Sequence, residues 1–364
     1  MDYDAPDWAK VAAGLISWSP DFAATPVVLQ DAAGRLSPDQ MENLRKRRVD
    51  SLVYLALEQS HPRQRLYDKL WAFQCRTIER VIAYLNCDGI DFLIFKGAEF
   101  VQKYFSGSVG MLYDVDFLIH RPDVGRVKRA LVQAGFRQAV FDTDNGCLKD
   151  RDVAEVAKME LSHYELAPFA VVEEVDLDDE EFMHAASYNE FPIWTIGTRA
   201  FFVVEVDIHH GIAMDIDGSE FFLRATSSVF RNARTLSASD HLWFTASRFY
   251  VELALHGKSS LRDFAYLQAI LSREDIDWNY VAQVASEYSI RPAIFYPLTF
   301  LGSISGVGIP DRFEPILRPT LEPKIRDFGW MIHLPFGFIP RLSAPAFVGC
   351  KAENLDGLAM KTLT

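Results

Sequence analysis

The chain has 364 residues, of which 49% are hydrophobic and 13% aromatic, so it can bury a sizeable core and a disordered protein is excluded. Its 37 Lys and Arg against 50 Asp and Glu give a net charge of −13, which argues against a long nucleic acid as the main partner, because proteins grip polyanions with a basic surface. The sequence has no run of about 18 apolar residues, which excludes a helix that spans a membrane.

The cysteines and the N-terminus indicate the compartment. The four cysteines are scattered, without the Cys-x-x-Cys spacing of a structural zinc site, and this favours a reducing environment. The first ten residues are acidic and contain no apolar segment, so we expect no secretory signal. We therefore predict a cytoplasmic protein.

The N-terminal region is predicted to be helical after a loosely structured beginning. Residues 1–36 are expected to be a lead-in segment with one helix near Trp8–Ile16. A second helix should begin after Ser37, because Ser at the N-cap, Pro at N1 and Gln40 at N3 form a capping box. We predict that this helix continues to about Gln59.

A long helix is predicted to start at Pro62. Apolar residues recur along it at the three- and four-residue spacing of one helix face, as at Leu66, Leu70 and Phe73. The sequence Asn86–Gly89 is a helix stop, because glycine adopts the left-handed conformation that ends many helices. The aromatic residues of this face are expected to belong to the core.

Residues 92–119 carry the most informative pattern of the chain. Two apolar runs, Phe92–Phe95 and Phe117–Ile119, are typical of buried strands. Between them lie a Lys-Gly pair, a short amphipathic segment, a Gly/Ser turn and an Asp-Val-Asp sequence. The predicted order is strand, helix, turn and strand.

Four residues of this stretch suit phosphate and metal chemistry. Asp114 and Asp116 should point to the same face of their strand, where two carboxylates can share a divalent metal ion. Gly97 lacks a Cβ, so backbone N–H groups of the following helix can approach an anion, and Lys96 adds a positive charge. The alternative is that Asp114 caps a turn and Asp116 pairs with a surface lysine, although Asp116 directly precedes an apolar run and an unpaired buried carboxylate is costly.

The pair Lys96-Gly97, followed by Tyr104 and then by Asp114–Ile119, resembles the uncharacterised nucleotidyltransferase family of the polymerase-β-like superfamily, in its Lys-Gly branch. The resemblance covers roughly residues 90–290 and is associational evidence. It implies a small mixed sheet that carries a metal site.

The resemblance also implies roles for four residues. Asp114 and Asp116 would bind the metal, and Lys96 and Gly97 would meet the triphosphate of a nucleotide. One departure concerns Val109–Tyr113, where many relatives carry an Arg shortly before the two aspartates. A phosphate contact of the family is missing from this position.

The next residues are predicted to continue an alternation of strand and helix. A helix should run from Arg121 to Gly135, followed by a strand at Phe136–Phe141. Residues 158–176 are expected to form strands with a break at Pro168.

His163 and Glu165 share one face of this predicted strand. They either point into a cleft or lie on the exposed side of the strand, and we favour exposure.

A further strand at Phe201–Gly211 places Glu205, Asp207 and His209 on one face. The resemblance implies that Asp207 is the third carboxylate of the metal site. We assign His209 to nucleotide binding; the alternatives are that it orients Asp207, lies near the acceptor or accepts a proton. A structural, hydrogen-bonded histidine explains His209 equally well. For Glu205 we favour an exposed strand position, with a role as spare metal ligand or base as the alternative.

From Ser237 the pattern becomes helical, with a start signal at Ser237–Asp240. The spacing of His256 and the pair Arg262-Asp263 resembles the helical segment that accompanies the catalytic sheet in this family. These residues either face the nucleotide or, for the Arg-Asp pair, form a structural salt bridge, which is the commoner arrangement.

The predicted fold is α+β, a small mixed β-sheet nucleotidyltransferase core flanked by N-terminal helices and followed by a helical region. We divide the chain into a lead-in segment at 1–36, a nucleotidyltransferase-like domain with N-terminal helices at 37–235, a helical domain at 236–302 and a proline-containing tail at 303–364. The tail is expected to be mobile or to depend on a partner.

By this resemblance, the protein is expected to move an NMP group from an NTP, with ATP as the first candidate, to a hydroxyl or phosphate of a small molecule, peptide or protein. Asp114, Asp116 and Asp207 would hold one or two Mg²⁺ ions, and Asp207 would position or deprotonate the acceptor. The alternative is a catalytically weak protein of the same fold that acts as a binding or partner module. A tRNA-directed transferase is a third reading, which the negative charge disfavours.

Overall fold

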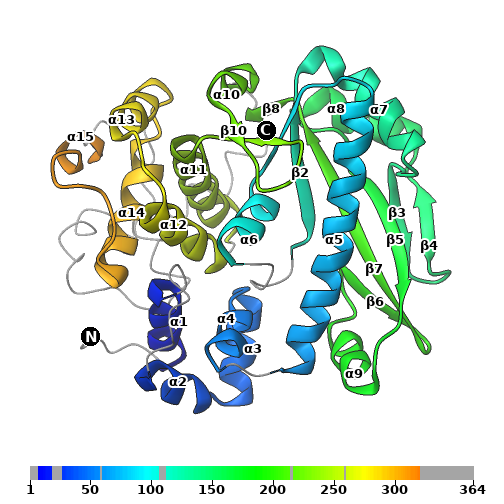
Figure 1. Cartoon of the computed structure of the whole chain (residues 1–364), viewed down its shortest axis with the longest axis horizontal. Helices are drawn as coiled ribbons and strands as arrows, with labels where there is room; N and C mark the ends of the chain where they lie inside the picture. Colours follow the sequence, from blue (N-terminus) through cyan, green and yellow to red (C-terminus); the bar gives the residue numbers. More distant parts are fainter. Residues whose placement is uncertain are drawn as a thin grey trace, which may run out of the picture. The chain divides into compact units, whose positions relative to one another are not determined.

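Figure 1 shows the chain as a computed structural model, which is described for residues 7–18, 27–57, 60–105, 112–213, 216–257 and 260–319. The chain divides into two compact units, one of Met1–Arg47 with Leu242–Thr364 and one of Arg48–His241. The predicted domain boundaries after residues 36, 235 and 302 stay a prediction.

The Arg48–His241 unit is built on a mixed sheet whose described part has seven strands, in the order β10-β11-β1-β2-β7-β5, with β6 paired to β7. β1 is antiparallel to β2, β2 is parallel to β7, and β7 is antiparallel to β5 and β6. The strands are β1 (Phe92–Phe95), β2 (Asp114–Ile119), β5 (Phe169–Val175), β6 (Ile193–Ile196), β7 (Arg199–His209), β10 (Thr226–Ser227) and β11 (Arg234–Thr235). Two smaller pairs are β3 (Ala139–Asp142) with β4 (Cys147–Asp150), and β8 (Gly211–Ala213) with β9 (Ile216–Asp217).

The central strands are buried because their sequences are almost wholly apolar. All four residues of β1 are buried, and every residue of β2 after Asp114 is buried. A strand that is covered on both faces usually has a continuous apolar sequence. Polar residues in such a strand are exceptions, and they need hydrogen-bond or charge partners. Apart from the exposed Arg199 at the start of β7, these exceptions in β2 and β7 are Asp114, Asp116, Glu205, Asp207 and His209.

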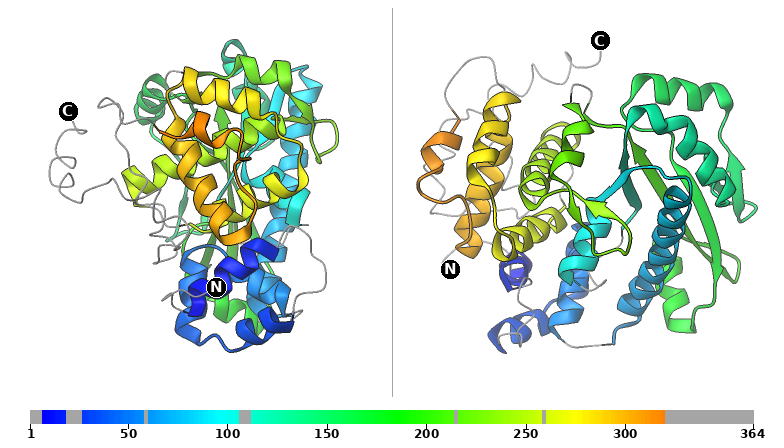
Figure 2. Two further views of the ribbon diagram at one scale, coloured as in Figure 1. Left: turned by 90° about the vertical axis from the view of Figure 1, so that its left-hand side faces the viewer. Right: turned by 45° about the horizontal axis from the view of Figure 1, so that its top comes forward.

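Helices flank this sheet. The long helix α5 (Pro62–Cys87) packs against β7 and also contacts α7 and α9; Figures 1 and 2 show it crossing the strands. The other helices of the unit are α4 (Asp50–Ala56), α6 (Gly97–Phe105), the 3-10 turn Arg121–Asp123, α7 (Val124–Gln133), α8 (Val153–Ser162), α9 (Asp179–Tyr188) and α10 (Ser219–Arg224). A mixed sheet with flanking helices confirms the predicted α+β fold.

The local start and stop signals of the first long helices are confirmed. Ser37 Oγ accepts a hydrogen bond from the Gln40 N–H at 3.3 Å, and the Gln40 side chain accepts one from the Ser37 N–H at 2.8 Å, which completes the capping box. α5 begins at Pro62 and is followed by Gly89 in the left-handed region, with φ of 58°. Both signals act within a few residues, which is why the sequence alone reveals them.

Two predicted elements are wrong. The helix expected to reach Gln59 ends at Lys46, because the chain turns at Arg48, whose φ is 63°. The segment from residue 158 is not a strand at first but the end of α8, which begins after Asp152, an N-cap that accepts hydrogen bonds from two backbone N–H groups. The expected break at Pro168 is confirmed, since β5 starts at the next residue.

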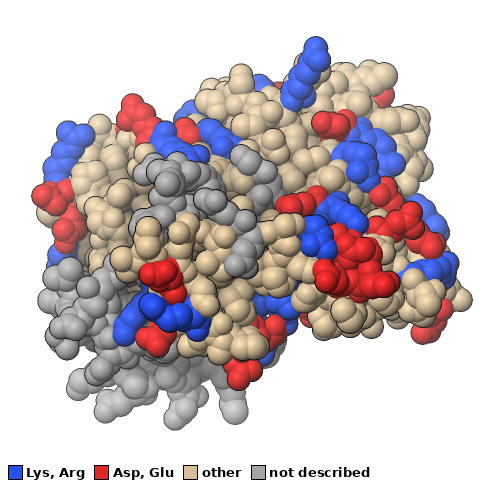
Figure 3. Space-filling model, turned by 60° about the horizontal axis from the view of Figure 1, so that its bottom comes forward, with Lys and Arg blue, Asp and Glu red and all other residues tan. Residues whose placement is uncertain are grey.

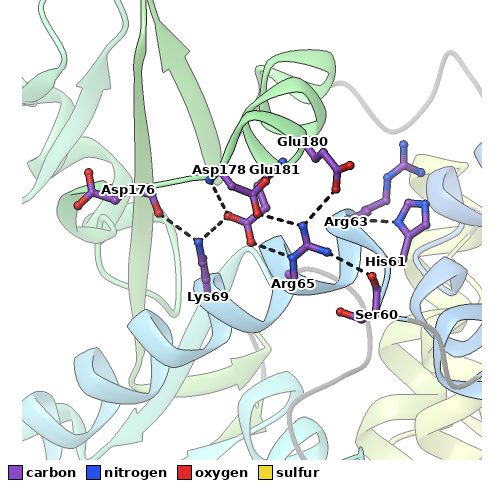
Figure 4. A network of polar contacts seen from close by, with 9 residues as sticks. All are labelled: Ser60, His61, Arg63, Arg65, Lys69, Asp176, Asp178, Glu180 and Glu181. Carbon is purple, nitrogen blue, oxygen red and sulfur yellow. Dashed lines mark hydrogen bonds and ion pairs between the residues drawn. The ribbon is translucent and has the colours of Figure 1, made fainter.

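An ion-pair network joins the first turns of α5 to the start of α9 (Figure 4). The Glu181 carboxylate is 2% exposed and lies 2.5 Å from Lys69 Nζ and 3.3 Å from Arg65 Nε. Glu181 also accepts the Asp178 backbone N–H at 3.0 Å, while Asp178 accepts the Glu181 N–H in return, so α9 has a capping box as well. This network fixes α9 to α5 with side chains of opposite charge.

The other unit is helical in its described residues. Its α1 packs against α2, α3, α12 and α14. The helices are α1 (Asp7–Trp18), α2 (Val27–Gly34), α3 (Pro38–Lys46), the greater part of α11 (Ala238–His256), α12 (Arg262–Arg273), α13 (Trp278–Glu287), α14 (Arg291–Ser305) and α15 (Glu314–Leu317). The lead-in thus has two helices rather than one, and most of the predicted tail, residues 320–364, lies outside the described residues.

None of the helices in the described ranges combines the length and the apolar character needed to cross a lipid bilayer.

Candidate functional site

The parallel pairing of β2 with β7 brings three aspartates together. Its register places Asp116 beside Asp207 and Asp114 beside Glu205. Asp114 and Asp116 are two residues apart on one strand and so share a face. One carboxylate oxygen from each of Asp114, Asp116 and Asp207 lies within 4.8 Å of those of the other two. The three predicted metal ligands therefore form one cluster.

Asp207 occupies the least favourable position in this cluster. Its Oδ1 atom is buried and has no hydrogen-bond partner among the described residues. Burial raises the pKa of Asp207 to about 9; repulsion from Asp114 and Asp116 adds to this rise, and the charge of Lys96 opposes it. A buried carboxylate among like charges is costly unless a cation compensates it. Three carboxylates supply oxygen ligands here, and the charge of Asp207 is not balanced by a hydrogen-bond donor. Such a set suits a hard divalent cation such as Mg²⁺.

Lys96 is held at the other side of the cluster. Its Nζ lies 2.5 Å from Asp116 Oδ1, and its side chain is only 12% exposed. The backbone of Lys96 has φ of 60°, a left-handed conformation that a non-glycine residue adopts at a cost of about 1–3 kcal/mol. The strained turn between β1 and α6 thus directs a cation onto Asp116. The predicted contact of Lys96 with a triphosphate stays a prediction.

Gly97 begins α6, next to this turn. A Cβ at Gly97 would lie 2.7 Å from Leu112 Cδ2, closer than real Cβ contacts allow. Leu112 is buried, and Gln74 donates a hydrogen bond to its carbonyl at 2.8 Å. Packing against Leu112 is therefore one reason for glycine here, and the predicted approach of an anion to this helix end remains a prediction.

His209 connects Asp116 with a carboxylate outside the sheet strands. Its Nε2 lies 2.9 Å from Asp116 Oδ1 and 3.1 Å from Lys96 Nζ, and its Nδ1 lies 3.1 Å from Glu165 Oε1. The ring is 2% exposed. His209 is hydrogen-bonded and buried, as a structural histidine would be, yet its partner is a predicted metal ligand. Its predicted contact with the nucleotide stays a prediction.

Glu165 is the site residue whose position the sequence interpretation missed. We favoured an exposed strand position, but Glu165 forms an antiparallel bridge with His209 at the end of β7. Burial raises the pKa of Glu165, but the hydrogen bond to His209 and the electrostatic interactions with His209 and Lys96 lower it to about 2. The only signal in the sequence was the alternation of His163 and Glu165 on one face, and nothing in it identifies the partner.

Glu205 extends the acidic face by one position. Burial raises its pKa, the charge of Arg151 lowers it and that of Asp114 raises it again. A guanidinium nitrogen of Arg151, which directly follows β4, lies 3.6 Å from Glu205 Oε1. Glu205 is half-buried rather than exposed, and its partner Arg151 is a second cation beside the acidic face that sequence reasoning did not single out.

The sequence model of the family described as uncharacterised nucleotidyltransferase matches residues 32–304. The chain belongs to this family. The match begins before α3 and thus includes the helices that precede the sheet, beyond the range of 90–290 suggested by motifs alone. Neither a curated protein nor a solved structure matches the chain significantly.

The family name indicates nucleotidyl transfer with a nucleotide as substrate. In this family member the predicted residues Lys96, Asp114, Asp116, Asp207 and His209 lie together on one face of the sheet, with Gly97 directly after Lys96. The arrangement can bind a divalent cation through carboxylates and holds one of them, Asp116, with the Lys96 ammonium group and the buried His209 ring.

His256, Arg262 and Asp263, whose spacing also resembles the family, belong to the other unit. Their predicted role stays a prediction.

Proposed function

We propose that the protein is a metal-dependent nucleotidyltransferase that moves an NMP group from an NTP to a hydroxyl or phosphate of a small molecule, peptide or protein. ATP is the first candidate donor. The observation that carries the proposal is the cluster of Asp114, Asp116 and Asp207. One oxygen of each lies within 4.8 Å of those of the other two, and Asp207 Oδ1 has no hydrogen-bond partner in the part of the chain that the structure describes.

The three aspartates would hold one or two Mg²⁺ ions. Such ions supply neutralisation of charge on phosphate oxygens and activation of the attacking oxygen. Asp116 is held in place by the half-buried Lys96 and the buried His209, so that little reorganisation is needed when a cation binds.

Two further roles follow for residues at the edge of the cluster. The N-terminus of α6 at Gly97, together with Lys96, would meet the triphosphate, since backbone N–H groups at a helix start favour anions. Asp207 would position the acceptor hydroxyl or take its proton. Burial raises the pKa of Asp207, so this role requires the bound cation to stabilise the ionised carboxylate.

A second candidate is a catalytically weak member of the family that acts as a binding or partner module. It is favoured by the absence of an Arg in the sequence Val109–Tyr113. However, Arg48, from another segment, places its guanidinium 4.0 Å from the centre of the Tyr113 ring, directly before Asp114 in the sequence. A phosphate contact missing from one position can therefore be supplied from elsewhere, and we prefer the enzyme.

Thermal unfolding tests the proposal. The unfolding temperature of the wild type is measured with each NTP, with and without Mg²⁺, and compared with that of Asp114→Asn, Asp116→Asn. The matched control is Asp144→Asn, Asp275→Asn, two exposed aspartates outside the cluster. Ligands that bind the native state raise the unfolding temperature by mass action.

We expect a metal-dependent rise for at least one NTP in the wild type and in the control, and no rise in the cluster variant. The NTP with the largest rise identifies the donor, which is then used to search for acceptors. An absence of any shift in the wild type would contradict the proposal and favour the partner module.

A further inference from the structure

The Glu165 carboxylate, the His209 imidazole and the Asp116 carboxylate form a continuous chain of polar contacts. This chain ends at the cluster of three aspartates. Both ring nitrogens of His209 are engaged, Nδ1 with Glu165 at 3.1 Å and Nε2 with Asp116 at 2.9 Å. A ring held at both nitrogens by carboxylates has a fixed orientation. The orientation of His209 therefore depends on Glu165.

On the basis of the proposed function, we infer that Glu165 is a positioning residue of the metal centre: it holds His209 so that the ring fixes the Asp116 carboxylate for the cation. Glu165 itself does not belong to the cluster of Asp114, Asp116 and Asp207. Its hydrogen-bonded connection to the cluster runs through the histidine, and its charge also raises the pKa of Asp207.

The backbone holds Glu165 in place on both sides. The Leu166 N–H donates to the Ile208 carbonyl at 2.9 Å, and the His210 N–H donates to the Tyr164 carbonyl at 2.9 Å. These two bonds enclose the bridge between Glu165 and His209. The position of the Glu165 side chain is thus set by the same strand end that carries the histidine.

Aromatic rings hold the faces of the imidazole. Tyr164 stacks on His209 with ring centres 6.0 Å apart, and the Phe95 ring meets it edge-on at 5.2 Å. These contacts restrict tilting of the ring, but they do not distinguish it from the ring turned by about 180° around the Cβ–Cγ bond, and the hydrogen bonds at the nitrogens decide between the two.

Lys96 and His209 act on the same oxygen of Asp116. Both Nζ of Lys96, at 2.5 Å, and Nε2 of His209, at 2.9 Å, contact Asp116 Oδ1. Without Glu165 the buried ring would lose its Nδ1 partner and could turn toward another acceptor, leaving one of these two donors misplaced. Partners of this kind behind metal ligands affect metal affinity strongly.

The inference is tested with Glu165→Ala and Glu165→Gln, with Glu174→Ala as the matched control. Glu174 is an exposed glutamate of β5 whose carboxylate pairs with Arg199 at 3.4 Å. The dissociation constant of Mn²⁺ or Mg²⁺ is measured on the full chain by isothermal titration calorimetry. We expect Glu165→Ala to weaken metal binding about 10–100-fold, Glu165→Gln to weaken it less because the amide oxygen still accepts a hydrogen bond, and Glu174→Ala to match the wild type.

Two measurements separate positioning from a general loss of structure. The unfolding temperature in chelator should remain close to that of the wild type for Glu165→Gln, which keeps the size of the side chain. The ¹⁵N shifts of the His209 ring should change in both Glu165 variants and stay constant in Glu174→Ala.

The outcomes are distinguishable. Wild-type metal affinity in a folded Glu165→Ala, or unchanged His209 shifts, would overturn the positioning role alone. If the wild type itself binds no divalent metal, the proposed function fails, and the positioning role with it.

Discussion

At the scale of single residues, the candidate site is a balance of charges on one face of a buried sheet. Asp114, Asp116, Asp207 and Glu205 concentrate negative charge, while Lys96 contacts Asp116 directly. The compensation is uneven, because no described residue forms a hydrogen bond with Asp207 Oδ1. This unevenness is what a bound cation would correct.

Gly97 gives a prediction about packing beside the site. Replacing it by Ala should destabilise the fold by about 1–3 kcal/mol, because the new Cβ would meet Leu112 Cδ2 at 2.7 Å. Urea unfolding measures this loss. The control is Gly125→Ala in α7, whose Cβ would find only an ordinary contact at 3.8 Å and which should be neutral or stabilising.

A double-mutant cycle identifies the cause. If the contact with Leu112 is responsible, Gly97→Ala should cost less in a Leu112→Ala background than in the wild type. Equal costs in both backgrounds would mean that another feature of the helix start requires glycine.

The residue-level predictions from sequence depended on spacing within one strand. Asp114 and Asp116 could be paired from the sequence because a separation of two residues fixes their common face. Asp207 required the family resemblance, since the pairing of β2 with β7 joins segments far apart in the chain. Glu165 was misjudged because its burial comes from His209, a partner that no local pattern announces.

At the scale of elements, helix ends show what local chemistry can and cannot specify. The capping box at Ser37 was visible in the sequence, whereas the break at Arg48 was not, because no glycine or proline marks its left-handed backbone. The Asp152 N-cap was also a local signal, and the helix of residues 153–162 was missed because its apolar residues alternate loosely enough to suggest a strand.

The network between α5 and α9 predicts how stability depends on pH. Burial raises the pKa of Glu181, but hydrogen bonds from Lys69 and from the Asp178 N–H lower it below its ordinary value of 4.5. A lowered pKa means that the stabilisation is fully present above about pH 4.5 and is lost as the pH falls through the lower value of the folded state.

Glu181→Gln should therefore lower stability at pH 7 by about 1–3 kcal/mol and flatten the loss of stability below pH 4.5. The free energy of unfolding in urea, measured from neutral to acidic pH, checks this. Glu180→Gln is the control, because that side chain is 65% exposed and pairs with Arg65 at 3.4 Å. Parallel pH profiles for Glu181→Gln and the wild type would contradict the assignment.

At the scale of the whole molecule, charge bears on the choice of acceptor. The net charge of −13 leaves no surplus of basic residues. On the face drawn in Figure 3, acidic and basic side chains lie side by side, and the acidic groups include those around α9. A surface of mixed charge suits a small molecule, peptide or protein better than a polynucleotide.

We predict that labelled tRNA binds weakly and that raising the salt from about 50 mM to about 200 mM changes the affinity little. Fluorescence anisotropy measures both quantities. Tight binding that weakens steeply with salt would instead indicate several phosphate contacts and revive a tRNA-directed transferase.

The central claim, that Asp114, Asp116 and Asp207 bind a divalent metal for nucleotidyl transfer, is tested most directly by a crystal structure grown with Mn²⁺ and a non-hydrolysable NTP analogue. We predict an anomalous difference peak between the three carboxylates, next to the triphosphate. A bound nucleotide without this peak, or a peak at other ligands, would contradict the claim.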